Sequence, residues 1–349
     1  MRLGIQLGYS GQANPSMTWA DAVEEVVEFE AAGAELVVVP EAYSFDAVSQ
    51  LGYLAARTSR MELASGVMQL YTRTPTLTAM TAAGIDYVSG GRFSLGLGAS
   101  GPQVIEGFHG VAYDAPLART REVVEICRKV WRRETLVHDG AHYRIPRAGK
   151  PLKLINRPVR DRIPILLAAM GPRNVALAAE IAEGWQALFL DPAALPEVFG
   201  PALAEGRARR DPALGPLDIM VPLPFAVADP TEELLARHRA QLALYIGGMG
   251  SRSRNFSNDL VGRYGYADQA ATIQELFLSG RRAEAAAAVP DRLVHATALV
   301  GRPAELRERV AALAAAGVTT LLVSPLAATR AERVKDIAEL KHVLIDNSL

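Results

Sequence analysis

Short apolar runs alternate with amphipathic stretches along most of the chain, which is the pattern of repeated strand and helix units. The run 35–39 is apolar after its first residue, as expected for a strand buried on both faces of a parallel sheet. The stretch 19–32 instead places apolar residues at helical spacing among acidic ones. We predict strands over 3–7, 35–39, 62–67, 93–98, 164–169, 185–190, 218–227 and 319–324. We predict helices over 19–32, 46–58, 75–88, 117–133, 172–183, 231–245 and 302–316, with further helical pattern up to residue 288.

Alternating strands and helices can form two α/β domains, an open doubly wound sheet or a closed (β/α)8 barrel. A barrel takes about 250 residues, so a chain of 349 residues leaves room for insertions. We therefore predict one α/β domain over 1–349, a (β/α)8 TIM barrel with insertions near 134–162 and 245–290. Pro222 and Pro224 in the seventh strand indicate a bend or an unpaired edge, because proline has no N–H to donate.

Composition and charge narrow the range of partners. The chain has 37 Lys and Arg against 38 Asp and Glu, a net charge of -1, which argues against a nucleic-acid partner. No apolar run has the length of a membrane span, and the N-terminal run is too short for a signal peptide. We expect a cytoplasmic protein with no membrane partner. Cys127 falls on the apolar stripe of a predicted helix, so we expect a buried, inert thiol.

Glycine-rich segments follow the third, fourth and fifth predicted strands, where a barrel of this kind binds its ligand. The spacing Gly96-x-Gly98-x-x-Gly101 matches the dinucleotide fingerprint, but it stands at the fourth strand-to-helix turn instead of the first. Two other interpretations remain open for these glycines. They turn a loop, or they let a flat ligand approach the backbone closely because they have no Cβ.

The segment 171–174 opens a predicted helix with Pro172 near its first position. Free backbone N–H groups and the positive end of the helix dipole favour an anion there, and Arg173 and Asn174 add side-chain donors. The segment is therefore a candidate phosphate site. The alternative is an ordinary helix start with a solvated arginine.

Three further polar residues need a structural or a chemical explanation. Glu41 follows a buried strand at the predicted rim, where a carboxylate pairs with an arginine or contacts the ligand. His138 and His142 have helical spacing, but the turn signal Asp139-Gly140 lies between them. We therefore predict a hairpin there and no metal site.

Nine segments together carry a more specific likeness: 40–43, 55–58, 65–67, 73–75, 89–93, 96–98 with 100–103, 106–107, 117–122, and 171–172 with 174–182. They resemble the bacterial luciferase-like monooxygenase family, and within it the branch that uses the deazaflavin F420. The resemblance implies a (β/α)8 barrel, usually a homodimer, which holds F420 or FMN at the carboxyl ends of its strands. It also implies a non-proline cis peptide at Ser65-Gly66 or Gly66-Val67, behind the central ring of the cofactor.

The resemblance also assigns site residues. Residues 98–103 would line the ring and tail of the cofactor, 171–174 would bind its phosphate, and Glu41 would lie near the ring. The cofactor-binding residues implied in this way are Ser65, Gly66, Val67, Gly98, Ala99, Ser100, Gly101, Pro102, Gln103, Met170, Gly171, Pro172, Arg173 and Asn174. Two positions depart from the family pattern: Met170 stands in place of an acidic residue, and Phe108-His109 in place of an aromatic pair.

These observations lead to three hypotheses for function. The first is an F420-dependent oxidoreductase that moves a hydride between deazaflavin C5 and a small organic substrate with a C=C, C=O or C=N bond. Glu41, Gln103 or His109 would supply the proton. The second is an FMN-dependent monooxygenase of the same fold. The third, suggested by Met170, is a non-catalytic flavin- or deazaflavin-binding protein.

The two insertions would supply the walls of the substrate site. The segment 247–258 is expected to be a loop, rich in small polar residues, that carries Arg252 and Arg254. These arginines either are solvated or form part of a lid over an anionic group.

Overall fold

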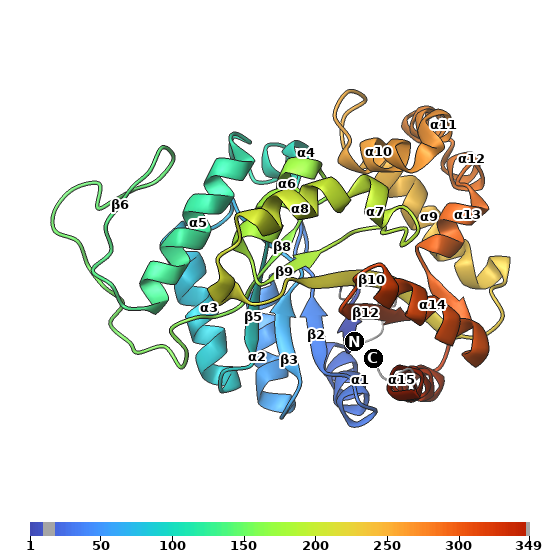
Figure 1. Cartoon of the computed structure of the whole chain (residues 1–349), viewed down its shortest axis with the longest axis horizontal. Coiled ribbons are helices and arrows are strands. Elements are labelled where there is room, and N and C mark those ends of the chain that lie inside the picture. The colour runs from blue at the N-terminus through green and yellow to red at the C-terminus, as the bar shows by residue number, and fades with distance from the viewer. Residues whose placement is uncertain (10–17, 347–349) are drawn as a thin grey trace.

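Eight parallel strands close into a barrel in the computed structural model, which describes residues 1–9 and 18–346 (Figure 1). The sheet closes because β12 pairs with β1 on one side and with β10 on the other, and β10 also pairs with β9. The barrel strands are β1 (Arg2–Gln6), β2 (Leu36–Val39), β3 (Glu62–Ser65), β5 (Phe93–Gly98), β8 (Ile165–Ala168), β9 (Gly184–Gln186), β10 (Asp218–Val227) and β12 (Thr320–Pro325). The predicted TIM barrel is confirmed.

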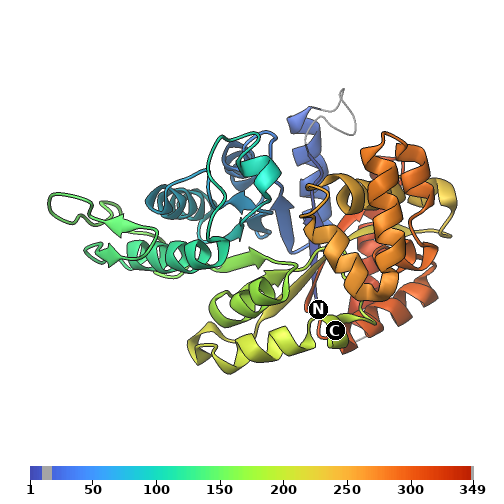
Figure 2. The same ribbon diagram turned by 90° about the horizontal axis from the view of Figure 1, so that it is seen from above.

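Helices surround the barrel, and most of the predicted ones are present with ends shifted by a few residues (Figures 1 and 2). They are α1 (Trp19–Ala31), α2 (Ala47–Arg57), α3 (Pro75–Ser89), α5 (Pro116–Trp131), α6 (Pro172–Ile181), α8 (Gly200–Ala208), α14 (Pro303–Ala315) and α15 (Arg330–Asp346). Sequence periodicity did not identify α8 or α15. No helix in the described part of the chain combines the length and the apolar character needed to cross a membrane.

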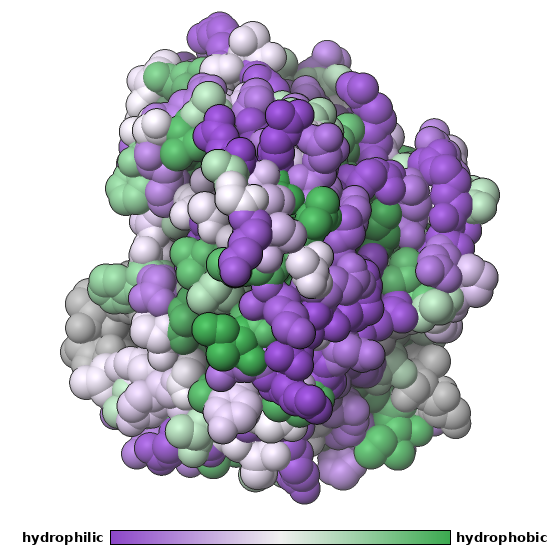
Figure 3. All heavy atoms as spheres, turned by 90° about the vertical axis from the view of Figure 1, so that its left-hand side faces the viewer, coloured by the Kyte–Doolittle hydropathy of each residue, from purple (hydrophilic) through white to green (hydrophobic). Residues whose placement is uncertain are grey.

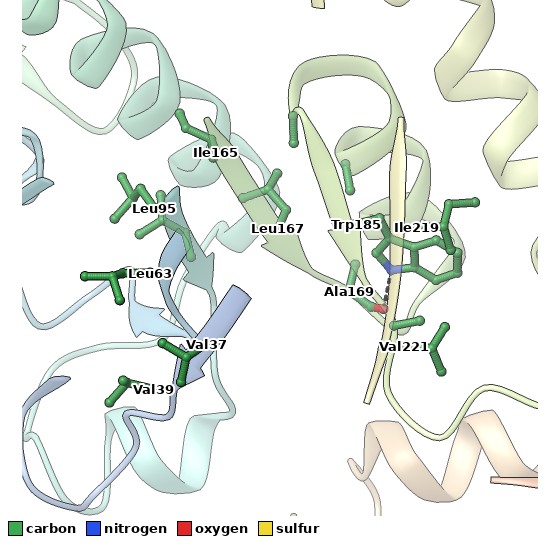
Figure 4. Packing of buried hydrophobic residues seen from close by; sticks show 14 of the residues in the cluster. Val37, Val39, Leu63, Leu95, Ile165, Leu167, Ala169, Trp185, Ile219 and Val221 are labelled. Atoms are coloured by element: carbon green, nitrogen blue, oxygen red, sulfur yellow. Dashed lines mark hydrogen bonds between the residues drawn. The ribbon is translucent and has the colours of Figure 1, made fainter. Parts of the chain in front are cut away.

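Strand residues alternate between the barrel interior and the layer beneath the helices. Leu36 and Val38 belong to a small interior cluster, whereas Val37 and Val39 pack in the large cluster between strands and helices. The rest of the interior cluster is Ala64, Leu166, Met220 and Leu322. Figure 4 shows the outer layer, where the Trp185 indole donates to the carbonyl of Ala169 at 2.9 Å. The alternation decides which side of a strand faces a ligand at the mouth.

The first insertion, 134–162, contains a short hairpin of β6 (His138–Asp139) and β7 (Arg144–Ile145), as the Asp139-Gly140 turn signal predicted. The hairpin extends away from the barrel at the left of Figure 1. The face on that side of the molecule is largely hydrophilic, with scattered apolar residues (Figure 3). The insertion is nevertheless anchored to the main core, because Leu136 is buried in it and Tyr143, Ile145 and Leu154 pack against it.

The second insertion is a cluster of helices with its own apolar core, drawn in yellow and orange in Figures 1 and 2. Its elements are α9 (Glu232–Gly248), α10 (Phe256–Val261), a π-helical turn at Gly262–Tyr266, α11 (Ala267–Leu278), α12 (Arg282–Ala287) and α13 (Asp291–Ala296). The prediction of a loop over 247–258 is wrong at both ends. Gly247 and Gly248 continue α9 instead of forming a loop. The side chain of Phe277 from α11 packs so close to them that a Cβ at either position would lie within 2.5 Å of it, so the close contact of the two helices requires glycine. Asn255 caps α10 by accepting from the backbone N–H groups of Ser257 and Asn258.

Two strands differ from the sequence-based expectation. The sixth predicted strand, 185–190, is shorter in the structure and ends at Gln186. A short strand, β11 (Leu299–Gly301), was not predicted and pairs with the end of β10. One edge of β10 pairs with β12, and the other edge pairs with two short strands. On that second edge β9 pairs with 218–220 and β11 pairs with 225–227, so residues 221–224 have no ladder partner there. Pro222 and Pro224 lie in that gap, so the predicted unpaired edge is confirmed locally.

Candidate functional site

The chain forms a bulge immediately after β3, at the mouth of the barrel. The Gly66-Val67 peptide is cis, at one of the two positions that the family resemblance implied. Ser65 fixes the bulge to β5, because its hydroxyl donates to the carbonyl of Gly96 and accepts from the Gly96 N–H, both at 2.9 Å. A Cβ on Gly96 would lie 1.8 Å from the carbonyl oxygen of Ser65, and one on Gly98 would lie 2.6 Å from Val67. Glycine at both positions is therefore required for the bulge to pack against β5.

Gln69 is a site candidate that the sequence analysis did not select. It lies in the two-residue strand β4 (Met68–Gln69), where Met68 is paired with Leu97 and Gln69 with Gly98. Met68 and Leu97 belong to the outer core, so Gln69 and Gly98 face the opposite side, toward the barrel mouth. Gln69 is 3% exposed, and its Nε2 has no hydrogen-bond partner within 1–9 and 18–346. A buried donor without a partner in a mouth is a group that a ligand can satisfy.

The glycine-rich loop after β5 lies next to the start of α6. A small cavity is lined by Gly98 and Ala99 from the loop and by Asn174 from α6. The Tyr113 hydroxyl donates to the carbonyl of Ser100 at 3.3 Å, which holds the loop from outside. Gly101 and Pro102 begin the four-residue helix α4 (Pro102–Ile105). Gln103 lies on α4 with an exposed side chain.

The two polar side chains of the predicted phosphate segment face different spaces. Gly171 precedes α6 without a side-chain cap, and Pro172 occupies the first turn, as predicted. Asn174 lines the cavity beside Gly98, whereas Arg173 lines a neighbouring groove between α5, α6 and α8. Arg121 and Arg209 in this groove both form ion pairs with Glu180. Arg173 has no ion-pair partner in the part of the chain that the structure covers, so its charge is available to an anion.

Met170 is held by the helical insertion. The Arg263 guanidinium donates to the Met170 carbonyl at 2.7 Å, and Ser257 contacts the Met170 sulfur at 4.0 Å. The Arg263 guanidinium also stacks over the Phe199 ring, 5.7 Å from its centroid. Its Nη1 is buried and has no partner among the described residues. Met170, the position at which the family pattern has an acidic residue, therefore lies next to the positively charged Arg263 guanidinium.

Glu41 forms the arginine pair that was one of its two interpretations. Its two oxygens accept from Arg73 at 2.5 and 2.9 Å, and one also accepts from the Ala47 N–H at the start of α2. The Glu41 side chain is 7% exposed and that of Arg73 15%. The pair ties the loop after β2 to the loop after β4, 32 residues further along the chain.

His109 lies near the segment that follows β2. Its ring packs edge-on against Phe108 at 5.0 Å, and Phe108 lies 5.9 Å from the ring of Tyr43. The His109 Nε2 is buried and has no partner in the described segments. His109 therefore places an unpaired ring nitrogen next to residues that follow β2.

His138, His142 and Cys127, to which the sequence analysis gave no chemical role, make structural contacts or are buried. His138 is buried and its Nε2 lies 3.1 Å from Glu122, which also accepts from the His142 N–H. Cys127 is buried and burial raises the pKa of its thiol to about 12, so it is inert. No group of three or more His, Cys, Asp or Glu side chains that could hold a metal lies within 1–9 and 18–346.

Comparison with known proteins shows the family of this chain. The model of luciferase-like monooxygenases matches residues 1–320. A Mycobacterium tuberculosis protein named as a coenzyme F420-dependent oxidoreductase is 42% identical over 350 residues, covering 97% of this chain and 99% of that protein.

Two solved structures share the fold. The coenzyme F420 dependent tetrahydromethanopterin reductase from Methanopyrus kandleri has a TM-score of 0.79 at 21% identity and covers 97% of both chains. The oxygenating constituent of 3,6-diketocamphane monooxygenase from Pseudomonas putida, in complex with FMN, has a TM-score of 0.65 at 18% identity, covering 99% of this chain and 98% of that one. With the whole-length sequence match and the closed barrel, these likenesses establish that the chain belongs to the luciferase-like monooxygenase family of enzymes.

Proposed function

We propose that this protein is an F420-dependent oxidoreductase, which transfers a hydride between deazaflavin C5 and a small organic substrate with a C=C, C=O or C=N bond. The observation that carries the proposal is the glycine-lined bulge at the barrel mouth, where the buried Gln69 amide has no partner. The relative named as an F420-dependent oxidoreductase supports this cofactor, because the likeness covers 97% of the chain. When bound, the deazaflavin supplies the hydride donor or acceptor.

The residues of the mouth fit a flat heterocycle. Ser65, Gly66 and Val67 form a wall fixed to β5, against which one face of the ring would lie. Gln69 Nε2 points into the same mouth and would donate to a carbonyl or nitrogen acceptor of the ring. Such a bond would satisfy a buried amide that is otherwise unpaired, and this is the general reason why ligands complete sites of this kind.

The start of α6 fits the phosphate of the cofactor. Its uncapped N-terminal N–H groups, the Asn174 amide and the Arg173 guanidinium form a set of donors beside the ring site. Met170 does not weaken this arrangement, because Arg263 binds its carbonyl and adds positive charge at the same loop. Arg173 would contact the part of the tail that leaves the cavity toward the groove of α5 and α8.

Among the three candidate proton donors, the contacts favour His109. Both oxygens of Glu41 are engaged by Arg73, and Gln103 is an exposed amide that does not ionise. His109 has a buried Nε2 without a partner in the described residues, and histidine is the side chain that most often transfers protons in catalysis. It is therefore the side chain best suited to exchange a proton with a bound substrate.

Oxidation of reduced F420, followed by its absorbance, tests this function. The protein is mixed with reduced F420 and a panel of small enones, aldehydes and imines, with a sample lacking protein as the control. We expect protein-dependent oxidation with at least one class of acceptor. No oxidation across the panel would favour the third hypothesis, a cofactor-binding protein without turnover.

We further propose that the protein is a cytoplasmic homodimer with no nucleic-acid partner. Leu77, Met80, Tyr87 and Val88 on α3 support a second copy as partner, because they expose between 47% and 70% of their surface. Apolar side chains gathered on one helix are typical of a protein contact. Light scattering of the purified protein would give twice the mass of one chain, 37.4 kDa, if the proposal is right.

A further inference from the structure

The inward-facing residues at the carboxyl ends of several barrel strands are partly exposed, although their outward-facing neighbours are buried. On β10, for example, Val221 and Leu223 are buried in the outer core, whereas Pro222 between them is partly exposed. The interior cluster, two residues further down the strands at Leu166, Met220 and Leu322, is buried. The partly exposed inward residues therefore form the floor of an open mouth. They are Gln6, Ala168, Gln186, Pro222, Pro224 and Ser324.

Two of these floor residues are glutamines, and their amides meet across the mouth. Gln186 Nε2 donates to Gln6 Oε1 at 3.4 Å, although the two residues are 180 positions apart in the chain. Their strands, β9 and β1, are not neighbours in the sheet, because β10 and β12 lie between them. The amide pair therefore spans the floor instead of running along the wall of the barrel.

The amide pair borders the bulge after β3. A Cβ on Gly66 would lie 3.6 Å from Gln6 Nε2, which is an ordinary van der Waals contact. The backbone of Gln6 is fixed at this place, because the Ser324 hydroxyl on β12 donates to the Gln6 carbonyl at 2.9 Å. A ligand held by the pair would therefore lie beside the Gly66-Val67 wall, where the proposed function places the cofactor ring.

The pair uses only part of its hydrogen-bonding capacity. A glutamine amide has two N–H donors and an oxygen that can accept two hydrogen bonds. Gln6 Nε2 donates once, to the Leu7 carbonyl at 3.3 Å, and Gln186 Nε2 donates once, to Gln6. The Gln186 Oε1 accepts no hydrogen bond from the residues that the structure describes. Both bonds are longer than the usual 2.9 to 3.0 Å of such contacts, so a ligand can replace them at low cost.

The unused groups are a donor on Gln6 and an acceptor on Gln186. The complementary ligand edge has a C=O next to an N–H, as in a carboxamide or a lactam. A ligand with a second acceptor in place of the N–H would set an oxygen against Gln186 Oε1 and leave that oxygen without a donor. A site that hydrogen-bonds an N–H discriminates strongly against an analogue that lacks it.

We propose that Gln6 and Gln186 bind the substrate through a carboxamide or lactam edge, with Gln6 donating to its carbonyl and Gln186 accepting from its N–H. The inference deepens the proposed function, on which it rests, by naming a group that the substrate carries in addition to the bond that is reduced. The contact of Gln6 with Gly66 keeps the bound substrate next to the bulge.

Two probes of the same shape test the pair without turnover. Isoindolinone has an N–H next to its carbonyl, and phthalide has a ring oxygen at the same position. Dissociation constants are measured by ligand-observed NMR on the full chain, with and without oxidised F420. The samples are the wild type, Gln6→Met and Gln186→Met, since methionine keeps an unbranched chain and removes the amide. Gln269→Met, at an exposed glutamine on α11, is the matched control.

The wild type and the control should bind isoindolinone about tenfold more tightly than phthalide, the value of one to two hydrogen bonds. Each glutamine variant should lose this preference and keep its affinity for phthalide. Thermal unfolding shows whether each variant is folded, and one folded variant is enough for the comparison. The proposal is overturned if the wild type does not prefer isoindolinone, or if a folded Gln6 or Gln186 variant keeps the preference.

F420 binding to the same samples, followed by fluorescence, separates this inference from the proposed function. Equal F420 affinity in the wild type and the variants, with isoindolinone still bound in the presence of F420, assigns the pair to the substrate. A lower F420 affinity in the variants, or displacement of isoindolinone by F420, assigns the pair to the cofactor and overturns the proposal. A wild type that prefers isoindolinone but does not bind F420 would defeat the proposed function and leave the amide pair as a binding site.

Discussion

The Arg263 guanidinium donates to the backbone carbonyl of Met170 at 2.7 Å, and this bond joins the helical insertion to the loop that begins α6. The two residues are 93 positions apart in the chain. The insertion therefore braces the loop that begins the candidate phosphate site.

Replacement of Arg263 by Ala should weaken both the fold and cofactor binding. The Met170 carbonyl would lose its donor, a loss of about 1 to 3 kcal/mol for a part-buried group bonded to a charge. Thermal unfolding and a fluorescence titration with F420 measure the two effects. Arg237→Ala on the exposed side of α9 is the control and should change neither. If the Arg263 variant binds F420 with wild-type affinity, the hydrogen bond between Arg263 and Met170 does not contribute to cofactor binding.

Replacement of Gln69 by Leu should separate binding from stability. The variant removes a buried amide donor that has no partner, so the free energy of unfolding should stay equal or rise. Affinity for F420 should nevertheless fall, by about tenfold for one buried hydrogen bond. Met68→Leu changes the adjacent residue on the opposite face and should keep the affinity. Equal F420 affinity in the Gln69 variant and the wild type would contradict the assignment.

Replacement of Gly96 by Ala should disrupt the bulge. The new methyl group would lie 1.8 Å from the Ser65 carbonyl oxygen, so the two backbone segments must separate. We expect a loss of about 1 to 3 kcal/mol in unfolding free energy, as for other overpacked cores. Gly101→Ala is the matched control, because its Cβ would meet no atom within 4 Å. Equal denaturation midpoints for the two variants would refute the packing argument.

We expect the free energy of unfolding to fall in mild acid because His238 is buried as a neutral imidazole. Thr297 donates its hydroxyl to the Leu293 carbonyl at 2.7 Å, so it accepts from His238 Nε2 at 2.8 Å and the ring is neutral with a bare Nδ1. Burial lowers the pKa of His238 from 6.5 to about 4. Between these pH values the unfolded chain binds the proton and the folded one does not, so stability falls as pH drops from 6.5 to about 4.

The corresponding loss is up to about 3 kcal/mol, since one pKa unit corresponds to about 1.4 kcal/mol. Chemical denaturation of the wild type and of His238→Gln at several pH values isolates this contribution as the difference between the two. His342→Gln on the surface of α15 serves as control. An identical pH dependence in the wild type and the His238 variant would rule out the buried neutral imidazole.

The sequence predicted those features that repeat or that depend on local spacing. Buried parallel strands are nearly continuous apolar runs, so segments such as 35–39 and 93–98 could be recognised one by one. The Asp139-Gly140 turn is equally local and gave the hairpin. β11 has three residues, too few for any periodicity, and was missed.

The features that sequence reasoning missed depend on contacts between distant segments. Gly247 and Gly248 read as a loop, but Phe277 packs so closely on them that only glycine fits inside α9 there. Arg173 and Asn174 are neighbours in a helix, yet successive residues are rotated by about 100° and face different spaces. Gln69 became visible as a candidate only when the pairing of β4 with β5 fixed the direction of its side chain.

A titration with both cofactors tests the central claim most directly. The purified protein is titrated with F420 and with FMN, and the fluorescence of each ligand is followed to saturation. The account predicts saturable binding of F420 at lower concentration than FMN, with the F420 affinity reduced in Gln69→Leu and kept in Met68→Leu. Tight binding of FMN with no response to F420 would contradict it and favour the FMN-dependent monooxygenase.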